Sequence, residues 1–169
     1  MVLGKRVAII GSPGSGKSTL ARTLGVRLGL PVVHLDAHFW RAGWVETEET
    51  QWRERVQALA HGERWIIDGN YSSTMDIRLP LAETIIFLDF PRWLCLLRAV
   101  RRWLTYQGRN RPDMAPGCPE RFDPDFLRWI WNYPQRSRPK TVALLRELQA
   151  EKRIVWLQSP GALRQFLGM

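Results

Sequence analysis

Lysine is scarce in this chain of 169 residues, which contains only Lys5, Lys17, Lys140 and Lys152. Arginine therefore carries most of the positive charge, and the formal net charge is +9 at pH 7. The planar guanidinium group of arginine can bind a phosphate through two parallel hydrogen bonds, whereas diffuse attraction to nucleic acid does not need that geometry. The composition modestly favours a pocket for polyphosphate, and a nucleic-acid partner stays open as an alternative that we do not favour.

Cysteine is also scarce, with two residues, and long apolar runs are absent. Cys95 and Cys118 have no CxxC partner, and we expect reduced thiols without a metal role. No apolar run reaches the length of about eighteen residues that a membrane span needs, and no signal-peptide pattern opens the chain. We therefore expect a cytoplasmic protein without a membrane partner. The length suits one domain over residues 1–169, and a second full domain is not expected.

Short apolar runs alternate with helical patterns along the chain. Runs typical of strands lie at 5–10, 31–35, 65–67, 84–88 and 154–157. Helical patterns lie at 17–30, 47–62, 91–107, 123–150 and 161–167, with breaks expected at Pro134 and Pro139. This alternation predicts a five-stranded parallel sheet with helices on both faces, in which ligands bind at the carboxyl ends of the strands.

A glycine-rich segment follows the first predicted strand and matches the pattern G-x-x-x-x-G-K-[ST] without a mismatch. Glycines in such a loop let successive backbone N–H groups point at one anion, and the next helix directs its positive dipole end at the same place. We expect nucleotide contacts from Gly11, Ser12, Pro13, Gly14, Ser15, Gly16, Lys17, Ser18 and Thr19. The pattern assigns Lys17 to the β- and γ-phosphates and Ser18 to Mg²⁺. Together with the alternation of strands and helices, it predicts a three-layer αβα P-loop NTPase fold.

Two further segments resemble the adenylate-kinase-like family of small P-loop kinases. They read Arg-Trp-Ile-Ile-Asp-Gly-Asn-Tyr at 64–71 and Thr-Ile-Ile-Phe-Leu-Asp-Phe-Pro at 84–91, followed by Leu-Arg-Ala-Val-Arg-Arg at 97–102. A more specific resemblance, to the branch labelled topology modulation protein (FlaR-related), rests on Trp40, Trp44, Asp68-Gly69-Asn70-Tyr71, Arg111-Pro112-Asp113, Gly117-Cys118 and Trp129-Ile130-Trp131. That resemblance covers nearly the whole chain.

The resemblance implies roles for several charged residues. Asp68 takes the Walker-B place beside Mg²⁺, although an aspartate before glycine can also simply cap a turn. Arg98 and Arg102 match catalytic arginines that neutralise the transferring phosphate, and their spacing puts them on one helix face. Residues 108–122 would form a short lid whose Arg109 and Arg111 close over the nucleotide. Arg136 and Arg138 fit either further phosphate contacts or a solvated face.

One departure from the family concerns the acceptor. Where adenylate kinases carry Asp-Gly-Phe-Pro-Arg, this chain reads Asp-Gly-Asn-Tyr-Ser at 68–72, so an arginine for an acceptor phosphate is missing. Arg78 is a candidate replacement. The ending of the second strand resembles shikimate and gluconate kinases, which implies that Asp36 meets an acceptor hydroxyl in a pocket walled by Trp40 and Trp44. The alternative is that Asp36 caps a turn and the tryptophans belong to the core.

These features together predict an ATP-dependent small-molecule kinase that uses ATP and Mg²⁺ and whose acceptor is a nucleotide or a hydroxylated metabolite. The alternative is a nucleotide-binding regulatory protein that interacts with DNA. A GTPase is disfavoured because the chain has no Asn-Lys-x-Asp signature. The sequence leaves open the preference for ATP over GTP, the identity of the acceptor and the oligomeric state.

Overall fold

The computed structural model describes residues 3–169 and contains a five-stranded parallel sheet in the order β2-β5-β1-β6-β7. The strands are β1 (Arg6–Gly11), β2 (Val32–His34), β5 (Trp65–Asp68), β6 (Thr84–Leu88) and β7 (Arg153–Leu157). All five lie where the apolar runs predicted them. The sheet is flanked by helices on both faces, so the expected three-layer αβα fold is confirmed.

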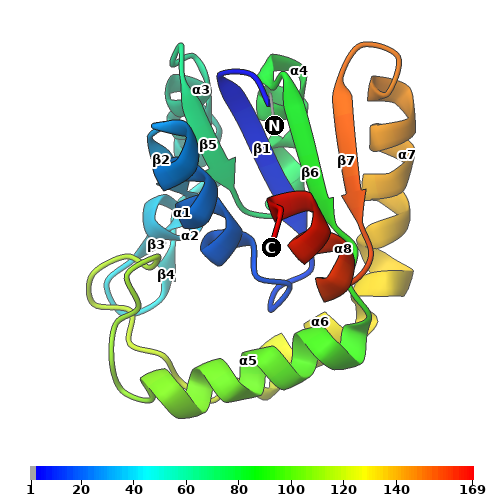
Figure 1. Ribbon diagram of the computed structural model, residues 1–169. Coiled ribbons are helices and arrows are strands. Elements are labelled where there is room, and N and C mark those ends of the chain that lie inside the picture. The colour runs from blue at the N-terminus through cyan, green and yellow to red at the C-terminus, as the bar shows by residue number, and fades with distance from the viewer. Residues whose placement is uncertain (1–2) are drawn as a thin grey trace.

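The sheet has a separate apolar core on each face because side chains alternate along a strand. Val7 and Ile9 of β1 point into one core, and Ala8 and Ile10 point into the other. The first core is completed by α1 (Lys17–Leu28) and α8 (Pro160–Leu167), and the second by α3 (Glu49–Ala60), α4 (Met75–Leu81) and α7 (Arg138–Leu148). Figure 1 shows these two groups of helices on opposite sides of the sheet.

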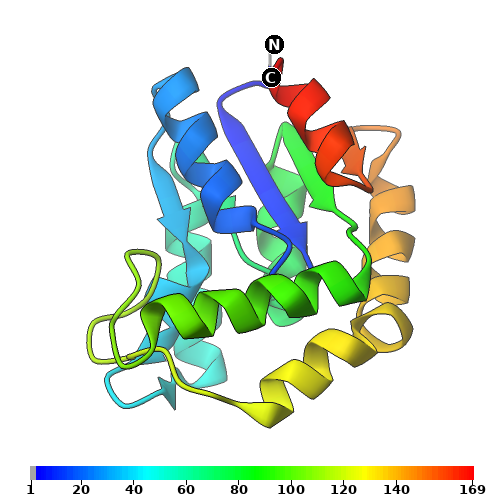
Figure 2. The ribbon, with the colours of Figure 1, turned by 60° about the horizontal axis from the view of Figure 1, so that its bottom comes forward.

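Two longer helices lie across the carboxyl ends of the strands. They are α5 (Arg92–Tyr106) and α6 (Pro124–Arg136), which pack against each other. Figure 2 brings both helices to the front, with the loop between them at one end of α5. This loop contains the predicted lid at 108–122, and no helix or strand of the described chain falls within it. The edge of the sheet that parallel topology assigns to ligands is therefore covered by α5, α6 and the lid.

Several short elements escaped the sequence patterns because each is too short to show a period. They are the helix α2 (Leu35–Phe39), the hairpin of β3 (Trp40–Arg41) and β4 (Val45–Glu46), the 3-10 turn η1 (Ser72–Thr74) and α4. The helix expected from residue 47 begins later, at Glu49, and its cap is Glu48. The Glu48 carboxylate accepts hydrogen bonds from the backbone N–H groups of Thr50 and Gln51.

The break in the last long helical pattern lies between the two prolines that we expected to cause it. Helix α6 ends at Arg136 and α7 begins at Arg138, so the junction is Ser137. Pro134 lies inside α6, whereas Pro139 occupies the first turn of α7, where a helix needs no N–H donor. Neither proline ends a helix at its own position.

Across residues 3–169, each helix is too short or too polar to cross a lipid bilayer.

Candidate phosphate-binding site

The loop between β1 and α1 has the tight backbone that the glycine-rich motif predicts. Gly14 has a φ of 76°, a left-handed conformation that side chains rarely adopt. A Cβ atom there would collide with the backbone carbonyl of Cys95 on α5. The loop is thus pressed against α5, and glycine is required at this contact for both conformational and steric reasons.

The amino end of α1 is suited to bind an anion. Its cap residue, Gly16, offers no side chain to the first N–H groups, and its first turn has no acidic residue. By contrast, α3, α6 and α8 are capped by the side chains of Glu48, Asp123 and Ser159. Uncapped N–H groups and the helix dipole make the start of α1 a phosphate-binding position.

Lys17 turns its side chain back over the loop. Its Nζ donates hydrogen bonds to the carbonyl oxygens of Gly11 at 3.0 Å and Ser12 at 2.9 Å. Burial lowers the pKa of Lys17, and the nearby charges of Asp36 and Asp68 oppose that shift. The ammonium group is therefore held where the motif expects the β- and γ-phosphates, with two carboxylates in electrostatic reach.

Asp68 ends β5 beside the loop and is bonded to a histidine. Its Oδ1 lies 2.6 Å from Nδ1 of His34 at the end of β2, and only 4% of its side chain is exposed. Partial burial alone would lower the pKa of His34, but the hydrogen bond and charge of Asp68 outweigh it and raise that pKa. Asn70, two residues beyond the end of β5, accepts a hydrogen bond from the Gly11 N–H at 3.2 Å. The end of β5 is thus tied to both β2 and the phosphate loop.

A lid residue also reaches the loop. Although burial raises the pKa of Asp113, the charge of Arg111 and a hydrogen bond from the Ser18 side chain are among the interactions that lower it overall. Ser18, Asp68 and Asp113 therefore supply hydroxyl and carboxylate oxygens, the donors that Mg²⁺ prefers. Within 3–169, no group of three or more His, Cys, Asp or Glu is placed to hold a metal ion by itself. Nucleotide-bound Mg²⁺ takes one or two protein oxygens together with phosphate oxygens, so Ser18 and Asp68 fit that ion chemically.

Asp36 lies in the short helix α2 rather than at a strand end. The phenol of Tyr71 donates a hydrogen bond of 2.6 Å to its Oδ1. Burial and the charge of Asp36 raise the pKa of Tyr71, which keeps the phenol protonated. This bond uses one carboxylate oxygen of Asp36 and fixes its orientation. The second oxygen has no hydrogen bond to another residue of the part of the chain that the structure describes.

Arg78 lies under this region instead of lining it. It is 1% exposed, and its Nη2 donates to the backbone carbonyls of Gly69 at 3.0 Å and Tyr71 at 3.3 Å. Burial lowers its pKa to about 10, so the group remains a cation at neutral pH. In this arrangement Arg78 supports the backbone that carries Asp68 and Tyr71.

Trp40 and Trp44 lie on the β3–β4 hairpin and pack against the lid. The two rings are 5.4 Å apart, and they cover a small cluster of Met114, Ala115 and Cys118. Nε1 of Trp44 donates to the carbonyl of Pro119 at 3.0 Å. The hairpin that was predicted to wall the acceptor pocket is therefore bonded to the lid.

The arginines of α5 divide as their spacing predicted. Arg98 donates from Nη1 to the Ser15 carbonyl of the phosphate loop at 3.0 Å. Arg102 is mostly buried, and burial lowers its pKa while the charges of Glu120 and Asp36 oppose this shift. Arg101 is exposed. In the lid, Arg109 is exposed, whereas Arg111 is 8% exposed and points at carboxylates.

Glu120 connects two of these arginines. It is 6% exposed, and its oxygens lie 3.0 Å from Nε of Arg102 and 2.7 Å from Nε of Arg111. Arg111 also pairs with Asp113 at 3.1 Å. This carboxylate is therefore the ionic centre that holds the loop at 108–122, the predicted lid, against α5.

We expect Glu120→Gln to open the lid locally. Removing the charge leaves the shielded guanidinium of Arg102 without its carboxylate and leaves Arg111 with Asp113 alone, a loss that costs about 3 kcal/mol at comparable buried pairs. Because the lid is a loop, the cost falls on lid order rather than on the whole fold. Cleavage by trypsin at the lid arginines should become at least about tenfold faster.

Glu151→Gln is the matched control for this experiment, because Glu151 is exposed and far along the chain from the lid. Equal cleavage rates in the two variants would contradict the assignment of Glu120 as the centre that holds the lid.

The two arginines left open by the sequence differ in placement. Arg138 forms a two-point ion pair with Asp89, at 2.7 and 2.8 Å, and Trp156 donates to the same carboxylate. Arg136 is exposed at the end of α6. In this structure Arg138 joins α7 to the end of β6.

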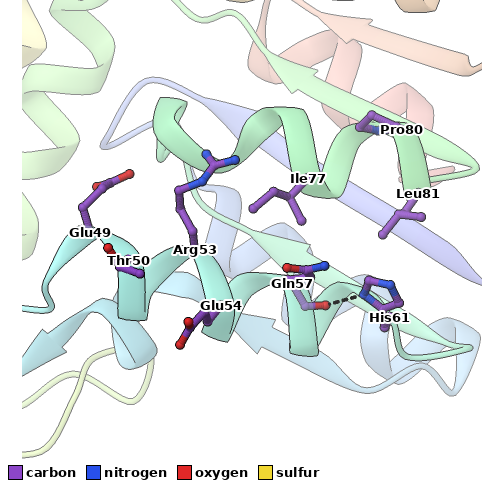
Figure 3. Close-up of a pocket in the computed structure, with 9 residues that line it drawn as sticks. All are labelled: Glu49, Thr50, Arg53, Glu54, Gln57, His61, Ile77, Pro80 and Leu81. Atoms are coloured by element: carbon purple, nitrogen blue, oxygen red, sulfur yellow. Dashed lines mark hydrogen bonds between the residues drawn. The ribbon is translucent and has the colours of Figure 1, made fainter.

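A groove of about 540 Å³ lies elsewhere, between α3 and α4. Figure 3 shows its walls, which combine charged side chains of α3 with apolar side chains of α4. The lining residues are Glu49, Thr50, Arg53, Glu54, Gln57, His61, Ile77, Pro80 and Leu81. None of them belongs to the phosphate loop or the lid, so this groove is separate from the site built around Lys17.

The structure thus brings Asp36, Asp68 and Arg102 within electrostatic reach of Lys17, and Arg98 onto the phosphate loop. It leaves Arg109 exposed and buries Arg78 beneath the backbone at 69–71. Sequence reasoning gave no role to five residues that contact the site: His34, Asn70, Tyr71, Asp113 and Glu120. Two of these were visible in sequence, because Asn70 and Tyr71 directly follow the Asp-Gly pair at the end of a strand.

Comparison with protein families gives a match over residues 7–89 to the AAA model, the ATPase family associated with various cellular activities. This segment runs from β1 through the phosphate loop to the end of β6. No curated protein sequence matches the chain.

Two solved structures share the fold. A gluconokinase from Sinorhizobium meliloti has a TM-score of 0.53 and 16% identity, and the alignment covers 95% of this chain and 85% of that one. A shikimate kinase from Bacteroides thetaiotaomicron has a TM-score of 0.53 and 14% identity, with 98% and 99% covered. At these identities the likeness establishes the fold, which is that of P-loop kinases.

Proposed function

We propose that this protein is an ATP-dependent kinase that transfers the γ-phosphate to a hydroxyl group of a small molecule. The observation that carries the proposal is the convergence of Lys17, Asp36, Asp68 and Arg102 beside the uncapped start of α1. A site that only bound nucleotide would need the loop and Lys17. A carboxylate with a free oxygen on the acceptor side is what phosphoryl transfer adds to it.

The proposed reaction uses these groups in fixed roles. The acceptor hydroxyl oxygen forms a bond to the γ-phosphorus while the bond from that phosphorus to the oxygen bridging to the β-phosphate breaks. The hydroxyl proton passes to Asp36, and ADP leaves with the bridging oxygen. Lys17, Arg98 and Arg102 balance the charge that spreads over the phosphate oxygens in the transition state. Mg²⁺, held by Ser18 and Asp68 with the nucleotide, would neutralise charge on the β- and γ-phosphates.

The acceptor that we propose is a hydroxylated metabolite rather than a nucleoside monophosphate. Adenylate-kinase-like enzymes need a cation for the acceptor phosphate, and the candidate here, Arg78, is buried and committed to the carbonyls of Gly69 and Tyr71. The structural likeness to a gluconokinase and a shikimate kinase supports the same direction. Aromatic side chains near Asp36 would pack against the carbon skeleton of such an acceptor. They include Phe39 and Tyr71, whose ring centroids are 4.7 Å apart.

A screen of acceptors tests the proposal. Purified protein with ATP and Mg²⁺ is offered sugars, sugar acids, hydroxylated carboxylic acids, nucleosides and nucleoside monophosphates, and ADP release is measured. Acceptor-dependent ADP release from a hydroxylated metabolite supports the proposal. If no compound raises ADP release but the protein binds duplex DNA in a salt-sensitive titration, the regulatory alternative and the topology modulation branch replace it.

Asp36→Asn should leave ATP binding intact and lower acceptor-dependent ADP release by about 10² or more, the usual range for loss of a general base. The substitution keeps the shape and the bond from Tyr71 but cannot take the acceptor proton. Binding of ATP and turnover are measured separately on the same preparation.

Asp125→Asn serves as the control because Asp125 is exposed on α6 and pairs only with its helical neighbour Arg128. Near wild-type phosphoryl transfer by the Asp36 variant would show that Asp36 is structural and that the acceptor site lies elsewhere.

A further inference from the structure

Helix α5 turns Cys95 and Ala99 to the apolar core, as a surface helix normally does, but it also exposes a second apolar side. Arg98 and Arg102 face inward, to the phosphate loop and to Glu120. Trp93, Leu97 and Leu104 lie on the other side and are 62%, 61% and 62% exposed. Surface helices normally turn their apolar stripe to the core and their charges to water. The nucleotide site explains why the two arginines face inward. It does not explain why the outward side of the helix is apolar rather than polar.

The apolar stripe of α5 begins one residue after Arg92, which contacts Trp131 of α6. The positions 93, 97 and 104 repeat at helical spacing, so the stripe extends for about 16 Å along the helix. At its start, the guanidinium of Arg92 lies 4.0 Å above the ring of Trp131, which is 45% exposed. Figure 2 shows α5 and α6 side by side on the outer surface. Isolated apolar residues are normal on a surface, whereas a continuous stripe of this kind marks a binding surface.

The charges around the stripe restrict what can cover it. Two arginines of α5 lie beside the stripe, the exposed Arg101 and Arg92 over Trp131, because the other two face inward. Helix α5 contains no acidic residue. On the outer side of α6 the acidic residue Asp125 is paired with Arg128 at 2.8 Å. A second copy of this chain would place arginine against arginine, which is unfavourable. Nucleic acid would supply negative charge, but Leu97 and Leu104 in the stripe have neither a ring on which bases stack nor a group that binds phosphate.

We propose that α5 and Trp131 form a peripheral docking surface for an anionic lipid bilayer. Leucine side chains enter the boundary between head groups and acyl chains, tryptophans prefer that boundary, and arginines pair with lipid phosphates. Docking by this surface leaves Arg98 and Arg102 facing the nucleotide site. Our expectation of no membrane partner rested on the lack of a spanning run, which does not bear on a helix that lies flat in the interface.

Vesicle co-sedimentation tests this proposal on the full chain. We expect binding to phosphatidylcholine vesicles that contain about 30% phosphatidylserine, no binding to pure phosphatidylcholine, and release at high salt. The double variant Leu97→Glu with Leu104→Glu should bind at least about tenfold less, because both changes put charge into the apolar stripe. Tryptophan fluorescence should shift to shorter wavelength on binding in the wild type only.

The matched control is Val26→Glu, because Val26 is an apolar residue of α1 that is 87% exposed outside this surface. Circular dichroism and thermal unfolding verify that all variants are folded. Absence of vesicle binding by the wild type overturns the proposal. So does a dimer, seen by light scattering, that the double variant dissociates, or DNA binding that the double variant abolishes. None of these outcomes depends on the acceptor screen, so this surface and the proposed kinase activity can fail separately.

Discussion

Lys17→Ala is expected to lower kcat/KM for ATP-dependent turnover by about 10³ or more, which exceeds the loss of a single neutral oxyanion donor. The physical reason is that Lys17 places a full charge beside the phosphates in a shielded site. In the structure its Nζ is already over the loop, bonded to the carbonyls of Gly11 and Ser12. Nucleotide affinity by titration calorimetry and the rate of ADP release are the two measurements.

The fold should survive this substitution, since the hydrogen bonds of the Lys17 ammonium group go to the loop carbonyls of Gly11 and Ser12. Lys140→Ala is the control, because Lys140 is an exposed lysine on α7. If the Lys17 variant bound ATP and turned over at the wild-type rate, the assignment of the loop as the phosphate site would be wrong.

Arg98→Ala and Arg102→Ala should each lower turnover by about 10³, because arginines that stabilise the transferring phosphate contribute at least that much in related reactions. Arg101→Ala should leave turnover nearly unchanged. The three residues lie on one helix within two turns, so they share its net electrostatic field. They differ in direction: Arg98 contacts the phosphate loop, Arg102 contacts Glu120, and Arg101 faces water.

Steady-state rates with a saturating acceptor separate specific phosphate contacts from a general effect of positive charge. Unequal effects, with Arg101→Ala near the wild type, support specific contacts to the phosphate. Equal losses at all three positions would indicate a general effect of positive charge, and the lid assignment would then lose its support as well.

The fold could be predicted from the sequence because its strands are short apolar runs and its loop motif permits one kind of backbone. β6 is the clearest case: Thr84–Leu88 is fully buried and was predicted with the same bounds. The helix α2 could not be predicted, since five residues show no helical period. Its presence places Asp36 on a helix instead of a strand end.

The candidate site could be predicted only where a motif names residue types. Lys17 and Ser18 follow from the loop pattern. Arg98 and Arg102 follow from the resemblance to adenylate-kinase-like kinases, and their spacing of four puts them on one helix face. The pairing of His34 with Asp68 depends on β2 lying next to β5, and a sequence does not state which strands are neighbours. The role of Glu120 could not be predicted, because nothing in its local sequence distinguishes it from a solvated carboxylate. Its contacts to Arg102 and Arg111 are seen only in the folded structure.

The contact between the β3–β4 hairpin and the lid has a thermodynamic consequence. Three hydrogen bonds join them, from the Gly43 N–H to Gly117, from the Trp44 indole to Pro119 and from the Cys118 thiol to Arg41. The lid therefore cannot swing away without the hairpin moving with it or these bonds breaking. Under the proposed function, one segment faces the nucleotide and the other faces the acceptor. Occupancy of either substrate site then biases the same moving unit, and reciprocity requires that each substrate change the affinity of the other by the same factor.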